Sequence, residues 1–180
     1  MKIAEFSVKK TAGKFTWSAA YTLSWTKLKI PGINEDREYF ASWDRRHNLN
    51  TNLFYEITPR WSIGAAWTYG TGRPITLPAG KYDHEQTSVL VFSERNGERT
   101  PAFHRLDLSA NLKSKKKPGR KWDSVWNFSV YNAYNRKNPF SVYTQNVGVG
   151  GSNATQTNNK QIVMLWFFPI IPSVTYTINF

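Results

Sequence analysis

The sequence predicts an all-β fold: an antiparallel, up-and-down transmembrane β-barrel segment of about seven strands, forming part of a larger barrel. Three observations predict it. Apolar and small polar residues alternate with period two along seven segments. The connections between these segments alternate between short and long. Aromatic residues, which make up 16% of the 180 residues, gather at both ends of the segments.

The first two predicted strands cover residues 4–9 and 15–26. Successive side chains of a strand point to opposite faces, so alternation gives each strand one apolar face and one polar face. In the first, Ala4, Phe6 and Val8 alternate with Glu5 and Ser7. The second is longer than most strands of soluble sheets. Its odd positions are Phe15, Trp17, Ala19, Tyr21, Leu23 and Trp25, and its even positions are Thr16, Ser18, Ala20, Thr22, Ser24 and Thr26.

The next two predicted strands cover residues 46–57 and 61–70, separated by a short turn at 58–60. Both repeat the alternation of the second strand, with Asn, Gly, Ser and Thr on the polar side. The apolar side of the pair consists of His47, Leu49, Thr51, Leu53, Tyr55, Ile57, Trp61, Ile63, Ala65, Trp67 and Tyr69.

The last three predicted strands cover residues 104–112, 125–131 and 173–180. Their apolar positions again fall two apart, which indicates that all seven strands present the same kind of face to the same surroundings. These positions are His104, Leu106, Leu108, Ala110, Leu112, Trp126, Phe128, Val130, Val174, Tyr176, Ile178 and Phe180.

The connections and the aromatic residues predict a membrane barrel rather than a soluble sheet. Short turns at 11–14, 58–60 and 113–121 alternate with long loops at about 28–45, 71–102 and 135–170, as in outer-membrane barrels. Trp and Tyr favour both bilayer interfaces because they combine an apolar body with a polar tip. Phe15, Trp17, Tyr55, Trp61, Trp122 and Phe180 fall near the short turns, and Trp25, Trp67, Tyr69 and Tyr134 near the long loops.

Composition excludes several other classes of protein. Without cysteine there is no disulfide scaffold, thiolate metal site or cysteine nucleophile. No apolar run is long enough for a transmembrane helix, and the first residues lack the apolar core of a secretory signal. A soluble β-sandwich with its aromatic faces packed together remains the structural alternative. The polar faces carry few Lys or Glu, which favours a lumen over a solvated outer surface.

Eight stretches of the sequence together extend over almost the whole chain. They are YTLSWTK (21–27), DRRHNL (44–49), TYGTGRP (68–74), ERNG (94–97), PAFHRLDLS (101–109), WNFSVYN (126–132), YNRKNP (134–139) and FPIIPSVTY (168–176). In this order they resemble the C-terminal end of a TonB-dependent outer-membrane receptor of the Bacteroidetes type.

The resemblance implies more than the residue patterns do. Such receptors have barrels of about 22 strands that are filled by an N-terminal plug. They import a large or scarce solute, of the siderophore, vitamin B12 or oligosaccharide class, with energy passed through TonB. Because residues 1–180 show no plug or TonB-contacting segment, we expect the C-terminal part of such a barrel, a fragment not competent for transport alone. The alternative is a stand-alone β-barrel or β-sandwich binding protein that acts through its long loops.

The predicted functional residues fall into two groups. The first faces the lumen, where the resemblance implies contact with the plug; solvation with ion pairing between strands is the alternative. The second resembles the C-terminal signal that the barrel-assembly machinery captures by strand addition. The lumen-facing group is Arg46, Asn48, Asn50, Glu56, Arg105, Asp107, Asn127, Ser129 and Tyr131, and the assembly signal is Val174, Tyr176, Ile178 and Phe180.

No catalytic residue, metal site or cofactor is expected. His47, His84 and His104 are scattered, and the adjacent residues of Asp83-His84-Glu85 point apart on an extended chain. The basic run at 113–121 lacks aromatic residues that stack on bases, so we expect a solvated turn and no nucleic-acid partner. The expected location is the outer membrane of a Gram-negative bacterium. The expected partners are its lipid and lipopolysaccharide, the barrel-assembly machinery, and the plug and TonB of a complete receptor.

Overall fold

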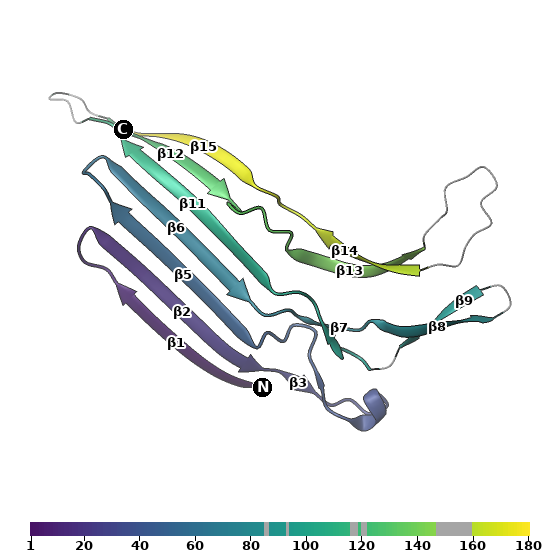
Figure 1. The fold of residues 1–180 in the computed structure, drawn as a ribbon. Helices are drawn as coiled ribbons and strands as arrows, with labels where there is room; N and C mark the ends of the chain where they lie inside the picture. Colours follow the sequence, from purple (N-terminus) through teal and green to yellow (C-terminus); the bar gives the residue numbers. More distant parts are fainter. Residues whose placement is uncertain (85–86, 93, 116–118, 120–121, 147–159) are drawn as a thin grey trace, which may run out of the picture.

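A seven-stranded antiparallel sheet dominates the computed structural model, which describes residues 1–84, 87–92, 94–115, 119, 122–146 and 160–180. Its strands follow one another in chain order, so the topology is an up-and-down meander (Figure 1). The seven predicted strands are confirmed, and the first is longer than predicted at both ends. They are β1 (Lys2–Lys10), β2 (Phe15–Trp25), β5 (His47–Glu56), β6 (Trp61–Gly70), β11 (Phe103–Lys113), β12 (Asp123–Tyr131) and β15 (Ile171–Asn179).

The register of the sheet brings the apolar positions of all seven strands onto one face. Each pair of neighbouring strands is in register without a bulge, so rows of paired residues cross the sheet. A slip of one residue would move a strand's whole apolar set to the other side. One row, for example, consists of Trp17, Leu53, Ala65, Leu108, Val130 and Pro172. We call this side the apolar face and the opposite side the polar face.

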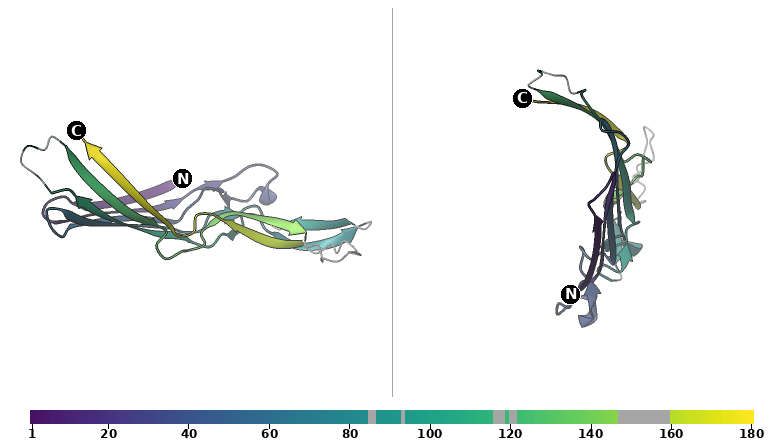
Figure 2. Two further views of the ribbon diagram at one scale, coloured as in Figure 1. Left: turned by 90° about the horizontal axis from the view of Figure 1, so that it is seen from above. Right: turned by 90° about the vertical axis from the view of Figure 1, so that its left-hand side faces the viewer.

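The sheet is a single curved layer, and it is open. Figure 2 shows it as an arc when it is viewed from the end that carries the short turns. β1 and β15 form its edges, and in the described part of the chain neither pairs with a further strand. Both edge strands run in the same direction, because every neighbouring pair between them is antiparallel. An all-antiparallel closure of the sheet on itself is therefore impossible.

The long connections differ from the prediction because they contain strands of their own. When these strands pair, their backbone N–H and C=O groups form hydrogen bonds with each other. In a structureless loop the same groups would bond to water. Residues 26–46 hold the pair β3 (Lys27–Leu28) and β4 (Tyr39–Phe40), with the 3₁₀ turn η1 (Asn34–Asp36) between them. Residues 71–102 hold β7 (Pro74–Ile75) paired with β10 (Glu98–Arg99), and β8 (Pro78–His84) paired with β9 (Thr87–Phe92). Residues 132–170 hold β13 (Pro139–Asn146) paired with β14 (Lys160–Trp166).

All three long connections leave the same end of the sheet, as predicted. The turns at 11–14 and 57–60, the end of β11 at Lys113 and the start of β12 at Asp123 lie at the other end, and the strand pairs β8–β9 and β13–β14 extend beyond the sheet (Figure 1). Within the described residues, no helix is both long and apolar enough to cross a membrane.

The described residues bury almost no apolar core. Tyr39 and Ala41, both in the first long connection, are the buried hydrophobic residues among them. The large side chains of the apolar face stay accessible: Leu53 is 40% exposed and Leu108 is 43% exposed. The small sheets lie at the long-loop end rather than over this face (Figures 1 and 2). The described part of the chain is therefore a single-layer sheet, not a β-sandwich.

Candidate functional site

The apolar face is banded along the strand direction. At the centre of β5, β6 and β11 this face is aliphatic, with Leu53, Ala65 and Leu108 in one row. Aromatic residues lie on both sides of that row. Toward the long loops they are Phe6, Tyr21, Trp25, Trp67 and Tyr69, and toward the short turns they are Phe15, Tyr55, Trp61, Trp126, Phe128 and Tyr176.

Aromatic pairs bind neighbouring strands together within these bands. The rings of Trp126 and Tyr176 lie 4.6 Å apart between β12 and β15, and those of Phe6 and Tyr21 lie 6.4 Å apart between β1 and β2. Ring separations of about 4.5–7 Å are favourable for aromatic side chains. Near the long-loop end, the Tyr21 hydroxyl and His47 Nδ1 lie 2.7 Å apart, so the polar tip of Tyr21 has a hydrogen-bond partner.

The polar face carries the predicted lumen-facing residues of the sheet, and several of them bond across strands. The Asn127 side-chain amide donates to Asn111 Oδ1 at 2.7 Å, and Asn111 Nδ2 lies 3.5 Å from Ser62 Oγ. Glu56 pairs with Ser62 in the same row. Ser129 lies between Ser109 and Ser173, Asn48 between Thr22 and Gly70, and Asn50 between Ala20 and Thr68. Phe54 is an apolar exception on this face.

Arg105, Asp107 and Tyr131 form one cluster on the polar face. Arg105 donates to Asp107 Oδ2 from Nε at 2.9 Å and to the Tyr131 hydroxyl from Nη1 at 2.6 Å. Its guanidinium also lies 4.1 Å from the centre of the Tyr131 ring. The other oxygen of Asp107 accepts the backbone N–H of Asn132 at 2.9 Å. The ion pair therefore lies within one strand rather than between strands, and it connects the sheet to the third long connection.

Arg46 occupies a different environment from the other predicted residues. It precedes β5, at the long-loop end, and its guanidinium lies between two rings, 4.9 Å from that of Trp25 and 5.6 Å from that of Phe40. Its Nε is buried, and no described residue forms a hydrogen bond with it. Arg46 thus packs against the first long connection by cation–π contact.

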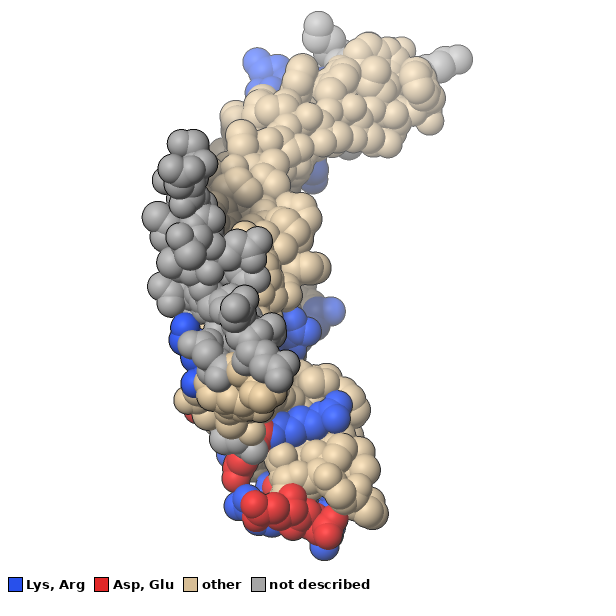
Figure 3. Space-filling view, turned by 90° about the vertical axis from the view of Figure 1, so that its right-hand side faces the viewer, with Lys and Arg blue, Asp and Glu red and all other residues tan. Residues whose placement is uncertain are grey.

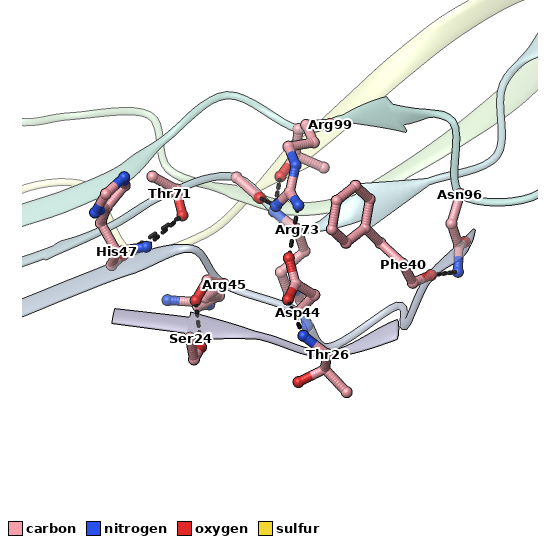
Figure 4. Close-up of polar contacts among 12 residues, drawn as sticks. Ser24, Thr26, Phe40, Asp44, Arg45, His47, Thr71, Arg73, Asn96 and Arg99 are labelled. Carbon is pink, nitrogen blue, oxygen red and sulfur yellow. Dashed lines mark hydrogen bonds and ion pairs between the residues drawn. The ribbon is translucent and has the colours of Figure 1, made fainter. Parts of the chain in front are cut away.

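Asp44 is a buried acidic residue at the long-loop end, and the pattern of the sequence does not indicate its role. Its carboxylate is fully buried, accepting the Thr26 N–H at 2.6 Å and Arg99 Nη2 at 2.6 Å (Figure 4). Arg99 also donates to the Gly72 carbonyl at 2.9 Å, and its guanidinium lies 4.8 Å from the Phe40 ring centre. One buried carboxylate therefore links the first long connection to the second.

Further contacts hold these two connections together. The Asn34 side chain and the Arg95 backbone bond reciprocally, at 2.7 and 3.1 Å, and Asn96 Nδ2 donates to the Phe40 carbonyl at 2.7 Å (Figure 4). Figure 3 views the molecule from its long-loop end and shows acidic side chains gathered near its lower tip. The ion pair of Arg37 with Glu94 also joins the two connections. The two connections form one structured body.

Asn132 organises the start of the third connection. It is 1% exposed and adopts a left-handed backbone with φ of 53°. Its side-chain amide donates to the carbonyls of Arg136 and Phe168, each at 3.0 Å, and its side-chain oxygen accepts the Arg136 N–H at 3.0 Å. Asn tolerates left-handed φ better than most residues do, which explains the residue type here. The Trp-Asn-Phe-Ser-Val-Tyr-Asn stretch (126–132) includes Asn132, but its spacing alone does not indicate this role.

The predicted C-terminal signal lies along the edge strand β15. Val174, Tyr176 and Ile178 lie on the apolar face, paired with Phe128, Trp126 and Ser124 of β12. Phe180 follows the strand and is 98% exposed. The other edge of β15 has no partner strand among the described residues, so it is accessible to an added strand.

Two other sequence segments fall partly outside the described residues. In the basic run at 113–121, residues 116–118, 120 and 121 lie outside them, as does Glu85 of the Asp83-His84-Glu85 triplet. No group of three or more metal-binding side chains occurs in the part of the chain that the structure describes.

No protein-family model, curated protein or solved structure matches this chain.

Proposed function

We propose that this chain forms part of the wall of an outer-membrane β-barrel in a Gram-negative bacterium. Specifically, it supplies the C-terminal strands of a receptor of the TonB-dependent kind that its sequence resembles. The observation that carries the proposal is the apolar face, which continues across all seven strands and has no protein layer over it in the described residues. An exposed apolar surface of this extent is rare on soluble monomers and marks a surface covered by a partner or by lipid.

The strand lengths match the thickness of a bilayer. The seven strands contain 9, 11, 10, 10, 11, 9 and 9 residues in chain order. At about 3.3 Å per residue and a tilt of about 45°, strands of 9–11 residues cross about 21–26 Å, close to the apolar band of about 25 Å in such barrels. In this arrangement Leu53, Ala65 and Leu108, at the centre of their strands, fall at mid-membrane, and the aromatic residues nearer the strand ends fall at the interfaces.

The residues of the polar face support the assignment of this face to a lumen. Its side chains are mostly small, and several are bonded to one another, as in Asn127–Asn111 and Arg105–Asp107. A water-filled or plugged lumen tolerates such a surface, whereas a surface facing bulk solvent usually carries many more Lys and Glu residues. In a complete receptor, we assign contact with the plug to this face.

The open edges support a role as one piece of a larger wall. Because β1 and β15 run in the same direction, an all-antiparallel barrel requires an odd number of further strands between them. We assign those strands, the plug and the TonB-contacting segment to the rest of the receptor, without which this chain does not transport a solute. We assign the β15 edge, with Val174, Tyr176, Ile178 and Phe180, to capture by the assembly machinery.

Two adjacent alanines provide a matched test of the membrane face. Ala65 lies at the centre of β6 on the apolar face, and Ala66 points to the polar face opposite Asp107. A lysine at mid-membrane costs about 2–4 kcal/mol, whereas a lumen position accepts it. We therefore expect Ala65→Lys, but not Ala66→Lys, to weaken insertion of the full chain into vesicles by at least tenfold.

The measurement is quenching of tryptophan fluorescence by brominated lipid, together with heat-modifiable migration on a gel. Tryptophans on the apolar face, such as Trp67 and Trp126, should be quenched in the unaltered chain. A folded monomer that stays in detergent-free buffer and is not quenched would contradict the membrane proposal. It would favour the alternative, a stand-alone β protein that binds through its ordered loops.

A further inference from the structure

An aromatic pocket lies on the polar face at the long-loop end, and the proposed wall does not account for it. The cavity has a volume of about 80 Å³, and Phe103, Arg105, Tyr131, Phe140, Phe167 and Phe168 line it. Phe103, Arg105 and Tyr131 come from the ends of β11 and β12, and the other three come from the third long connection. Residues distant in sequence thus build one concave site.

The walls of this pocket are rings in mutual contact. The centre of the Phe167 ring lies 4.7 Å from that of Phe140 and 6.1 Å from that of Phe168, and the Phe168 ring lies 6.2 Å from that of Tyr131. Phe140 and Phe168 are nevertheless 59% and 60% exposed. Phe168 also has a φ of 59°, a left-handed conformation that is costly for a bulky residue and recurs at ligand sites.

Part of the positive charge around the pocket is already balanced. Arg105 is paired with Asp107, whose second oxygen accepts the Asn132 N–H. Both oxygens of that carboxylate therefore already accept hydrogen bonds, one from Arg105 and one from Asn132. Aromatic walls alone would also suit a cationic ligand, so the neighbouring charges decide which ligand the pocket accepts.

Two further guanidiniums contact residues that line the pocket, and neither has a carboxylate partner among the described residues. Arg45 lies over the Phe103 ring at 5.9 Å from its centre, and Arg73 Nη2 donates to the Phe140 carbonyl at 3.4 Å. Neither forms an ion pair with any carboxylate of the described residues. Burial, and then the charge of nearby Arg73, lower the pKa of the Arg45 guanidinium. A ligand that brings a negative charge relieves this repulsion.

We propose that this pocket binds a planar aromatic anion, with its ring between the phenylalanine side chains and its acidic group toward Arg45 and Arg73. A cavity of about 80 Å³ accommodates a single ring rather than a fused system. Arginine is suited to this task because its planar fork binds a carboxylate with two parallel hydrogen bonds. If the ligand is part of the imported solute, that identity rests on the proposed function. The existence of the pocket does not depend on the proposed function.

The test uses the full chain in detergent and two probes of matched shape. 4-Fluorobenzoate carries the negative charge, 4-fluorobenzyl alcohol does not, and broadening of the fluorine NMR line reports binding relative to protein-free micelles. We expect the benzoate to bind at least tenfold more tightly than the alcohol. Acetate, which has the charge without the ring, should not compete.

Variants separate the contributions of ring and charge. Arg45→Gln combined with Arg73→Gln should weaken benzoate binding at least tenfold, and Phe167→Leu should weaken it several-fold. The matched controls Arg60→Gln, in a short turn, and Phe54→Leu, elsewhere on the polar face, should leave it unchanged.

Two results would overturn the site: no benzoate binding, or equal binding of both probes by the unaltered chain. Failure to bind benzoate in a chain quenched by brominated lipid would refute the pocket and leave the membrane wall standing. Benzoate binding by a chain that stays soluble without detergent would support the pocket and refute the membrane wall.

Discussion

Removal of the Asp44 carboxylate should release the packing between the first two long connections. Asp44→Ala deletes a fully buried group that accepts the Thr26 N–H and Arg99 Nη2, both at 2.6 Å. Breaking a buried ion pair by removal of one partner costs about 3–5 kcal/mol. The Arg99 side chain is 31% exposed and keeps its bond to the Gly72 carbonyl, so the cost falls at the lower end, about 3 kcal/mol.

Hydrogen exchange at the Ala41 amide measures this cost locally. The amide donates to the Thr26 carbonyl at 2.9 Å, and Ala41 is fully buried, so exchange requires the connection to open. Since each 1.4 kcal/mol is about a factor of ten, Asp44→Ala should accelerate exchange about 100-fold.

The matched control is Glu38→Ala, in the same connection. Its ion pair with Lys27, at 3.2 Å, joins side chains that are 51% and 60% exposed. Such pairs contribute about 0–1 kcal/mol, so exchange at Ala41 should change by no more than about fivefold. If the two variants accelerate exchange equally, Asp44 does not hold the connections together and the argument fails.

Two further predictions concern the backbone at the loop end and the end of the chain. At Gly72 an added Cβ would collide with the Thr100 carbonyl, so Gly72→Ala should cost about 1–3 kcal/mol and speed exchange of the Thr100 amide, which bonds to Arg73. Unchanged exchange at Thr100 would mean that the backbone near residue 72 accommodates the added Cβ without loss of stability. Deletion of Phe180 should reduce outer-membrane insertion of a receptor that ends in β15, measured as the heat-modifiable fraction; equal insertion would remove Phe180 from the assembly signal.

Much of the sheet is predictable from the sequence because the alternation of side chains along each strand is a local pattern. In β6, Trp61, Ile63, Ala65 and Trp67 alternate with smaller or polar residues, and a period of two assigns each to a face without knowledge of its neighbours. The polar face is predictable on the same ground, which is why Asn50, Arg105 and Asn127 are correctly placed on one side.

The loop end is less predictable because its contacts join residues far apart in sequence. β8–β9 and β13–β14 were expected as loops, since a short strand pair without long alternation leaves little periodic signal. Asp44 belongs to the Asp-Arg-Arg-His stretch, but the partner that makes it important, Arg99, is 55 residues away. No local pattern indicates that pairing.

The sequence by itself therefore determined seven strands, their two faces and the alternation of short turns with long connections, because side-chain direction along a strand depends only on position. The tertiary structure decided how those connections pack. Only in three dimensions do the Asp44–Arg99 ion pair, the Asn132 hydrogen bonds and the ring contacts of Phe140, Phe167 and Phe168 exist. Each depends on chain segments whose proximity is set by the sheet that carries them.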